Sequence, residues 1–154
     1  MEEIENNETS EYIRTEKVAL RLIARAEQCS AGLARKLKKR KFDDAIINEV
    51  ICKLTEINLL DDRRYARLWL QSRLRFARSP RLLLSSLYSR GIDRDDAEAA
   101  LRTVLNEEDT EFTLLTRFLK KYGKKADDAR SLKFLLKNEG FSIQTIQRFL
   151  DEES

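Results

Sequence analysis

The chain has 154 residues, of which 42% are apolar and 37% charged, with a formal net charge of +3. It contains no histidine, so the commonest general base and the commonest metal ligand are both absent. Its apolar runs are too short to span a membrane, and its acidic start lacks the basic region of a signal peptide. Cys29 and Cys52 do not have the spacing of a metal site or a disulfide framework. We therefore expect a monomeric, cytoplasmic protein that has no cofactor or metal and contacts no membrane.

The first eleven residues are acidic and contain few apolar side chains. Such a composition predicts a mobile acidic tail over residues 1–11. The first helix is expected from Tyr12 onward, because Tyr12, Ala19 and Ile23 recur at helical spacing.

Three similar segments follow one another along the chain. Each has a helix, a tight turn and a second helix, and the turns contain Phe42, Ile92 and Phe141, which lie about 50 residues apart. In this alignment six columns are entirely apolar, among them Leu33/Leu83/Leu132, Leu37/Leu87/Leu136 and Ile47/Ala97/Ile146. A period of this length is typical of stacked helical repeats.

The turn residues support this alignment. Gly91 and Gly140 suit the left-handed position that ends a helix, whereas Lys41 occupies the same position with a steric cost. Asp43, Asp93 and Ser142 follow as helix N-cap candidates.

An additional helix precedes each pair. In the second repeat Asp61 and Asp62 are expected to cap a helix whose core face includes Tyr65 and Trp69, and in the third repeat the helix contains Phe112 and Phe118. Ser79 and Pro80 are typical of a helix start. The fold prediction is all-α, with three tandem three-helix repeats at 12–57, 58–106 and 107–154 in an elongated, curved molecule.

Basic residues are concentrated in two stretches. Residues 35–41 are nearly all basic, and residues 63–92 contain eight arginines and no acid. Blocks of one sign create strong local potentials, and arginine offers a planar fork to phosphate or carboxylate. The partner is therefore either nucleic acid or an acidic protein groove. Phe76 is the candidate for an exposed aromatic. The candidate basic face consists of Arg35, Lys36, Lys38, Lys39, Arg63, Arg64, Arg67, Arg73, Arg75, Arg78 and Arg81.

Catalysis has little support in the sequence. There is no glycine-rich phosphate loop and no nucleophile motif. Glu107, Glu108 and Asp109 form the densest carboxylate group, but consecutive residues point in different directions around a helix. We expect no enzyme activity.

The ordered set of residues resembles the RecX family of recombination regulators. The resemblance rests on residues 60–66, Arg73 and the turn at Gly91 in the second repeat, on residues 24–30 in the first, and on residues 120–122 in the third. The chain departs from the family pattern at Lys41 and in the loop 76–80, where the family usually has glycine.

This resemblance implies a function in homologous recombination, DNA repair and the SOS response. RecX-like proteins lodge in the groove of the RecA recombinase filament on DNA and inhibit its extension, ATPase and strand exchange. They are expected to bind single- and double-stranded DNA weakly or through the filament. The alternative is a stand-alone nucleic-acid-binding helix-turn-helix module.

Overall fold

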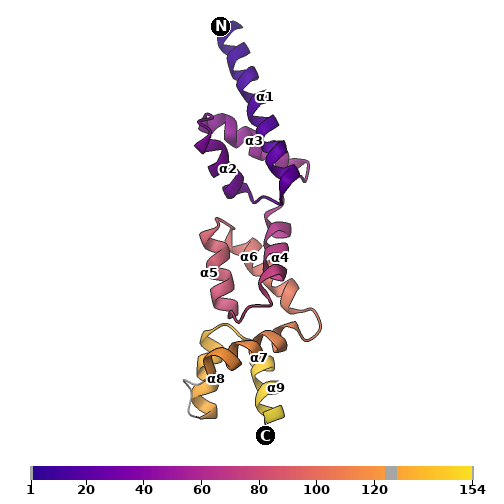
Figure 1. The fold of residues 1–154 in the computed structure, drawn as a ribbon, viewed down its shortest axis with the longest axis vertical. Coiled ribbons are helices and arrows are strands. Elements are labelled where there is room, and N and C mark those ends of the chain that lie inside the picture. Colours follow the sequence, from indigo (N-terminus) through magenta and orange to yellow (C-terminus); the bar gives the residue numbers. More distant parts are fainter. Residues whose placement is uncertain (1, 124–127, 154) are drawn as a thin grey trace. The chain divides into compact units, whose positions relative to one another are not determined.

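The computed structural model describes residues 2–123 and 128–153, and in this part of the chain the regular elements are nine helices (Figure 1). They are α1 (Glu2–Arg25), α2 (Ser30–Lys39), α3 (Asp44–Glu56), α4 (Asp62–Arg73), α5 (Pro80–Ser89), α6 (Arg94–Leu105), α7 (Thr110–Tyr122), α8 (Ala129–Asn138) and α9 (Ile143–Glu153). The all-α prediction with three helices per repeat is confirmed. None of the described helices has the length and hydrophobicity of a membrane span.

The chain divides into two compact units, and the division falls inside α4. Unit 1 contains Met1–Tyr65 and Arg90–Ile92, and unit 2 contains Ala66–Ser89 and Asp93–Ser154. The repeat boundaries at residues 57 and 106 remain a prediction.

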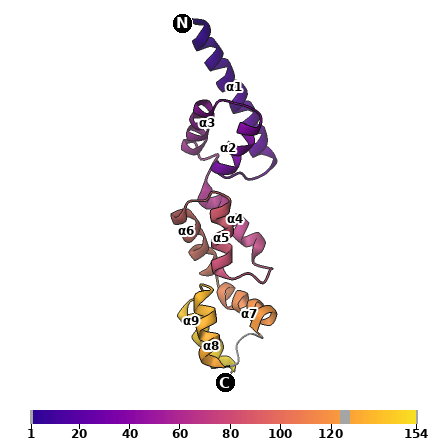
Figure 2. The same ribbon diagram turned by 90° about the vertical axis from the view of Figure 1, so that its left-hand side faces the viewer.

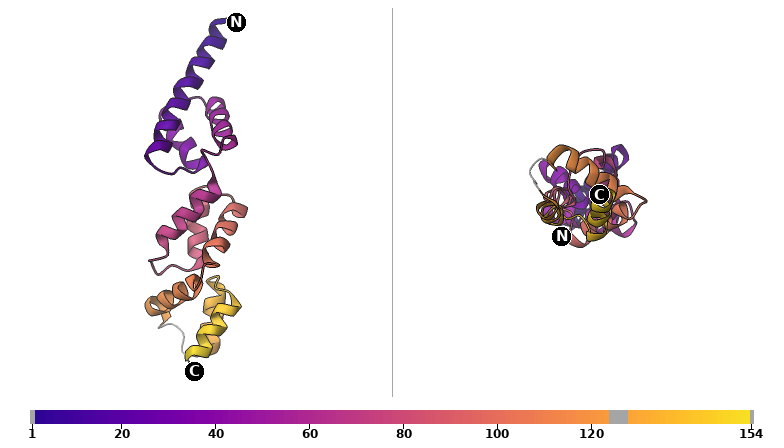
Figure 3. Two further views of the ribbon diagram at one scale, coloured as in Figure 1. Left: turned by 90° about the vertical axis from the view of Figure 1, so that its right-hand side faces the viewer. Right: turned by 90° about the horizontal axis from the view of Figure 1, so that it is seen from below.

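In unit 1 the helices α1, α2 and α3 pack against one another (Figure 3). The core contains Ala19 from α1, Leu33 and Leu37 from α2, and Val50 and Leu54 from α3, all nearly inaccessible to solvent. Burying a leucine side chain contributes roughly 1.5–3 kcal/mol. The apolar columns of the first repeat are therefore the residues that hold these helices together.

In unit 2, α5 packs on α6, and α9 packs on both α7 and α8 (Figure 2). Leu83, Leu87 and Leu136, which continue the same apolar columns, are completely buried. Phe141 from the third turn lies with its ring centroid 5.7 Å from that of Phe118 on α7. The predicted core face of the third repeat therefore forms as expected.

The turns that follow α2 and α8 have the same hydrogen bonds. The Phe42 N–H donates to the Leu37 carbonyl and the Lys41 N–H to the Lys38 carbonyl, and Phe141 and Gly140 make the equivalent bonds to Leu136 and Lys137. These bonds form a Schellman ending, in which a residue in the left-handed conformation closes the helix, and the turn residues predict that conformation. Lys41, Gly91 and Gly140 all have a positive φ, of 66°, 85° and 93°.

The predicted helix starts are also in place. Asp43 accepts the Ala45 N–H, the Ser142 hydroxyl accepts the Thr145 N–H, and Asp93 is the N-cap of α6 through its backbone conformation alone. Ser79 precedes Pro80 and accepts the Leu82 N–H. The sequence therefore determines where these helices begin through local capping.

The two aspartates before α4 have different partners. Asp61 accepts the Arg64 N–H and caps α4, as expected. The carboxylate of Asp62 instead accepts the Ser30 N–H at the start of α2, 32 positions earlier in the chain. Asp62 therefore joins the start of α4 to the start of α2.

Residues 2–11, for which the sequence predicts a mobile tail, are helical in the structure as the first part of α1. This part of α1 extends beyond α2 and α3 (Figure 1). Two features account for the helix: Glu2, Glu3 and Glu5 lie in the first turn, where the helix dipole favours acids. Glu11 also accepts the backbone N–H of Asp43. The structure therefore gives these residues a helical conformation, and their mobility stays a prediction.

Candidate partner-binding surfaces

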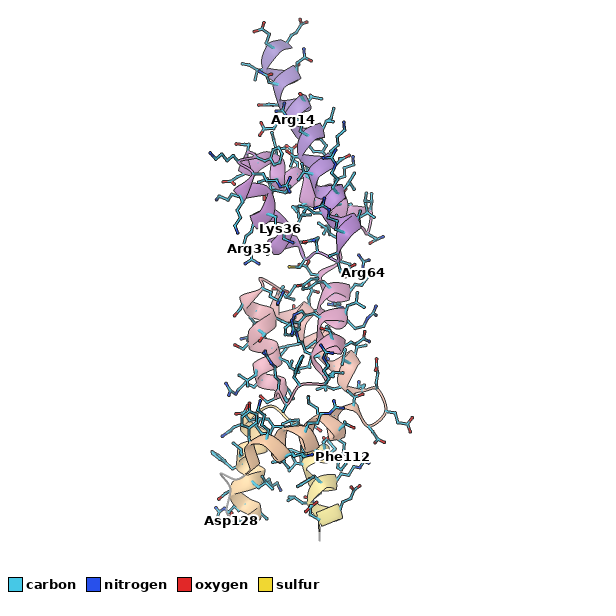
Figure 4. The ribbon with its side chains drawn as sticks, in the orientation of Figure 1. Arg14, Arg35, Lys36, Arg64, Phe112 and Asp128 are labelled. Carbon is cyan, nitrogen blue, oxygen red and sulfur yellow. The ribbon has the colours of Figure 1, made fainter. Side chains whose placement is uncertain are left out.

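Three basic residues of the first stretch line a pocket in unit 1. Arg35, Lys36 and Lys39 on α2 surround a cavity of about 310 Å³ together with Arg90 and Tyr65. Figure 4 shows Arg35 and Lys36 on α2. Sequence reasoning placed these three cations in the candidate site but missed Arg90 and Tyr65, which come from later segments of the chain. We call this cavity the α2 pocket.

Lys38 lies on α2 but does not line the α2 pocket. Its ammonium group is 3.7 Å from the carboxylate of Asp44, and both side chains are largely exposed. An ion pair of this kind contributes little to stability. Lys38 is therefore available to a partner.

The two arginines at the start of α4 differ in their surroundings. Arg63 is exposed, whereas Arg64 is half-buried. The Arg64 guanidinium donates to Glu27 at 2.7 Å and to the carbonyls of Asn58 and Leu59. Arg64 therefore fixes the loop between α3 and α4, a structural use that the sequence prediction did not foresee.

In unit 2 the predicted arginines lie on α4 and on the loop that follows it. Arg67, Arg75 and Arg78 are exposed, and Arg73 is half-buried with its guanidinium 5.3 Å from the centre of the Trp69 ring. Phe76 is 42% exposed, as expected, and the Arg75 guanidinium lies 4.9 Å from the centre of its ring. The loop thus presents a cation stacked on an accessible aromatic ring.

Arg81 is in an ion pair within unit 2. Its guanidinium donates to Glu139 at 3.1 Å, and the buried Ser79 hydroxyl donates to the other oxygen of the same carboxylate at 2.6 Å. Burial alone would raise the pKa of Glu139, but these two donors outweigh it and hold the pKa below its ordinary value. Arg81 therefore anchors the turn after α8 to the start of α5.

Three cations of α7 join Arg75 in a second pocket, of about 290 Å³. These are Arg117, Lys120 and Lys121. The Arg117 guanidinium donates to the Leu74 carbonyl at 2.6 Å, which fixes α7 against the loop that carries Arg75. The basic run at Lys120 is visible in the sequence, but its proximity to Arg75 is not. Lys124 and Lys125 lie outside the described residues.

The acidic residues considered for a metal site do not come together as one. Asp109 pairs with Arg148 at 2.6 Å, and the Arg148 guanidinium stacks on Phe112 at 4.0 Å. Within residues 2–123 and 128–153, no group of three potential ligands has the geometry of a metal site. In the described structure Asp109 therefore serves to hold α9 near the start of α7.

Two family models match the chain. The model described as the first three-helix domain of RecX matches residues 17–54, and the model of the second matches residues 61–101. The first match ends within α3, and the second extends from the start of α4 into α6.

Two relatives named as RecX proteins are similar to most of the chain. "Regulatory protein RecX" of Treponema pallidum (strain Nichols) is 36% identical over 140 residues, covering 90% of this chain and 85% of the relative. The protein of the same name from Prosthecochloris aestuarii is 38% identical over 122 residues, covering 76% of this chain and 78% of the relative.

The crystal structure of RecX from Lactobacillus salivarius has the same fold. It superposes with a TM-score of 0.70 at 21% identity, covering 94% of this chain and 97% of that one. The family models, the two relatives and this fold together establish that the chain belongs to the RecX family of regulatory proteins.

Proposed function

We propose that this protein binds the RecA recombinase filament on DNA and inhibits its extension, ATPase and strand exchange. Membership of the RecX family carries the proposal. In this way the protein modulates homologous recombination and the SOS response. It acts by occupying the filament and performs no chemistry of its own.

The basic residues support a partner that is polyanionic. Unit 1 offers Arg35, Lys36, Lys38 and Lys39 on α2. Unit 2 offers Arg75 and Arg78 on the loop after α4, together with Lys120 and Lys121 on α7. Three other arginines of the basic face have a structural role. The guanidiniums of Arg64 and Arg81 are in ion pairs, and that of Arg73 lies against the Trp69 ring. Charges grouped in this way accelerate and orient association with an oppositely charged surface.

Binding measurements with three targets test the proposal. The purified protein is titrated into labelled RecA–single-stranded DNA filaments, into the same DNA without RecA, and into RecA without DNA. A filament regulator binds the assembled filament most tightly. Equal affinity for filament and bare DNA would contradict the proposal.

The same titrations distinguish the alternative, a stand-alone nucleic-acid-binding module. Such a module would bind bare duplex tightly, and its affinity would fall roughly 10³–10⁵-fold between 50 and 200 mM salt if it contacted six to ten phosphates. A filament regulator would show weak binding to bare duplex at both salt concentrations.

A further inference from the structure

We propose that the α2 pocket binds a phosphate group of the nucleic-acid backbone. Four cations line it: Arg35, Lys36, Lys39 and Arg90, all within unit 1. The wall also contains one carboxylate, that of Glu27, which is already paired with Arg64 at 2.7 Å. The pocket therefore has an excess of positive charge that a bound anion would balance.

The cations are held in place by polar groups within unit 1. Gln28 is only 7% exposed, and its amide donates to the carbonyls of Leu22 and Ala26, so that its oxygen is left to accept from the Lys36 ammonium at 2.8 Å. Arg90 donates to the Tyr65 hydroxyl at 2.9 Å. A buried amide that orients an ammonium group is a feature of a preorganised site.

Gly32 lines the α2 pocket, and because it has no side chain it leaves space there. A glycine inside a helix lowers helix stability, and Gly32 is neither in a turn nor at a positive φ. A Cβ atom at this position would lie 3.1 Å from the Cys29 sulfur and 3.9 Å from an Arg35 guanidinium nitrogen, both in the pocket wall. The equivalent positions of the other repeats hold Leu82 and Ser131. The glycine therefore leaves room beside Cys29 and Arg35 that a side chain would occupy.

A phosphate suits this site better than a carboxylate ligand. Guanidinium forks and ammonium groups around one cavity match a tetrahedral anion with several acceptor oxygens. Lys38, Arg40 and Lys41 continue the positive charge along the end of α2, as expected for a polymer of phosphates that extends past the pocket. The inference rests on the proposed function only in taking nucleic acid, and not a free nucleotide, as the source of the phosphate.

The test measures binding of a fluorescein-labelled oligothymidylate by anisotropy over a range of salt concentrations. The variant is Lys36→Gln with Lys39→Gln, and the matched control is Lys17→Gln with Arg21→Gln on exposed sites of α1. Because the pocket takes one phosphate, and each phosphate contact on single-stranded DNA contributes about 0.7 to the slope of log K against log salt, the pocket variant is expected to lose roughly 0.7 of slope. The control keeps the wild-type slope. Equal slopes for the pocket variant and the control would overturn the inference.

A second variant, Gly32→Ala, reduces the volume of the α2 pocket and leaves its net charge unchanged. It is expected to weaken oligonucleotide binding several-fold while circular dichroism shows unchanged helix content, since the helix preference of alanine offsets the tight contact of its Cβ with the Cys29 sulfur. Unchanged affinity in this variant would contradict the pocket as the binding site. ATP and inorganic phosphate are added as competitors in separate titrations. If the pocket variants lose ATP binding but retain oligonucleotide binding, the assignment to nucleic acid is wrong.

The RecA ATPase of the same variants separates this inference from the proposed function. If the wild-type protein suppresses the ATPase but the pocket variants bind oligonucleotide normally, the pocket inference fails alone. If the wild-type protein leaves the ATPase unchanged but the pocket variants lose oligonucleotide binding, the proposed function fails and the pocket stands.

Discussion

Lys41 and Gly91 occupy equivalent turn positions, and both have a positive φ. They differ in what surrounds them. A Cβ on Gly91 would lie 2.5 Å from the Ala31 side chain, and one on Gly140 would lie 3.2 Å from Pro80. Glycine at 91 and 140 is thus required by close packing as well as by conformation, whereas the lysine at 41 meets only the conformational cost.

We predict that Gly91→Ala destabilises the protein by about 2 kcal/mol or more, since a left-handed backbone and a steric clash both oppose it. Lys41→Gly is expected to stabilise it by up to about 1 kcal/mol, because relief of the backbone cost exceeds the added entropy of the unfolded chain. Urea unfolding followed by circular dichroism measures both. Similar stability changes of the same sign would contradict this reading of the two turns.

Glu139 should make stability depend on pH. Its pKa is lowered in the folded protein, with burial opposing and the donors Ser79 and Arg81 producing the shift. A lowered folded pKa means that the carboxylate stabilises the fold above its ordinary pKa of 4.5, and that this contribution is lost as the pH falls through the folded pKa. We predict that Glu139→Gln destabilises the protein at pH 7 and that the difference from wild type shrinks below pH 4.5.

Unfolding in urea at a series of pH values between 3 and 7, on the order of one unit apart, checks this prediction. Glu107→Gln serves as the control, because it removes a carboxylate from an exposed loop. A constant difference between Glu139→Gln and wild type across this range would show that the carboxylate is not stabilised by its donors.

The sequence predicts features that depend on neighbouring residues, but it does not predict contacts between residues far apart in the chain. The turns and the caps at Asp43, Ser79 and Ser142 rest on residues within one helical turn, so the pattern predicts them. Arg64 and Arg81 belong to the predicted basic face, and the pattern does not show that they also pair with Glu27 and Glu139, which lie 37 and 58 positions away. Contacts at that separation depend on packing between helices, which a single sequence does not reveal.

The helix α7 contributes a basic edge that complements the loop after α4. Arg75, Lys120 and Lys121 line one pocket with Arg117, and the exposed ring of Phe76 is adjacent to Arg75 in the chain. Cations beside an accessible aromatic ring suit single-stranded nucleic acid, because bases stack on the ring while phosphates contact the cations. This group of residues is therefore a sharper target for mutation than the arginine stretch as a whole.

We predict that reversing Arg75, Lys120 and Lys121 to glutamate abolishes inhibition of RecA, because the surface then repels a polyanion. The matched control reverses Arg130, Lys133 and Lys137, three exposed cations of α8, and is expected to retain most of the inhibition. Far-ultraviolet circular dichroism of both variants should report unchanged helix content. Loss of inhibition in both variants to the same degree would indicate that only net charge matters.

The acidic start of α1 is helical, although its composition is typical of a segment without regular structure. Few apolar residues and many glutamates predict a tail, but the same glutamates favour a helix N-terminus, and Glu11 bonds to the Asp43 N–H. Glu111 makes the equivalent bond to the Ser142 N–H in the third repeat. The repeat thus includes a carboxylate contact between its first and third helices that the apolar columns do not encode.

In the proposed function, a protein built of three-helix repeats restrains RecA by occupying its filament. The most direct measurement is the rate of phosphate release by RecA on single-stranded DNA with ATP, as this protein is titrated in. We expect suppression at fewer than one molecule per RecA protomer, because a bound molecule affects more of the filament than the protomers it touches. An ATPase rate that stays unchanged at every ratio, including excess, would contradict the proposed function.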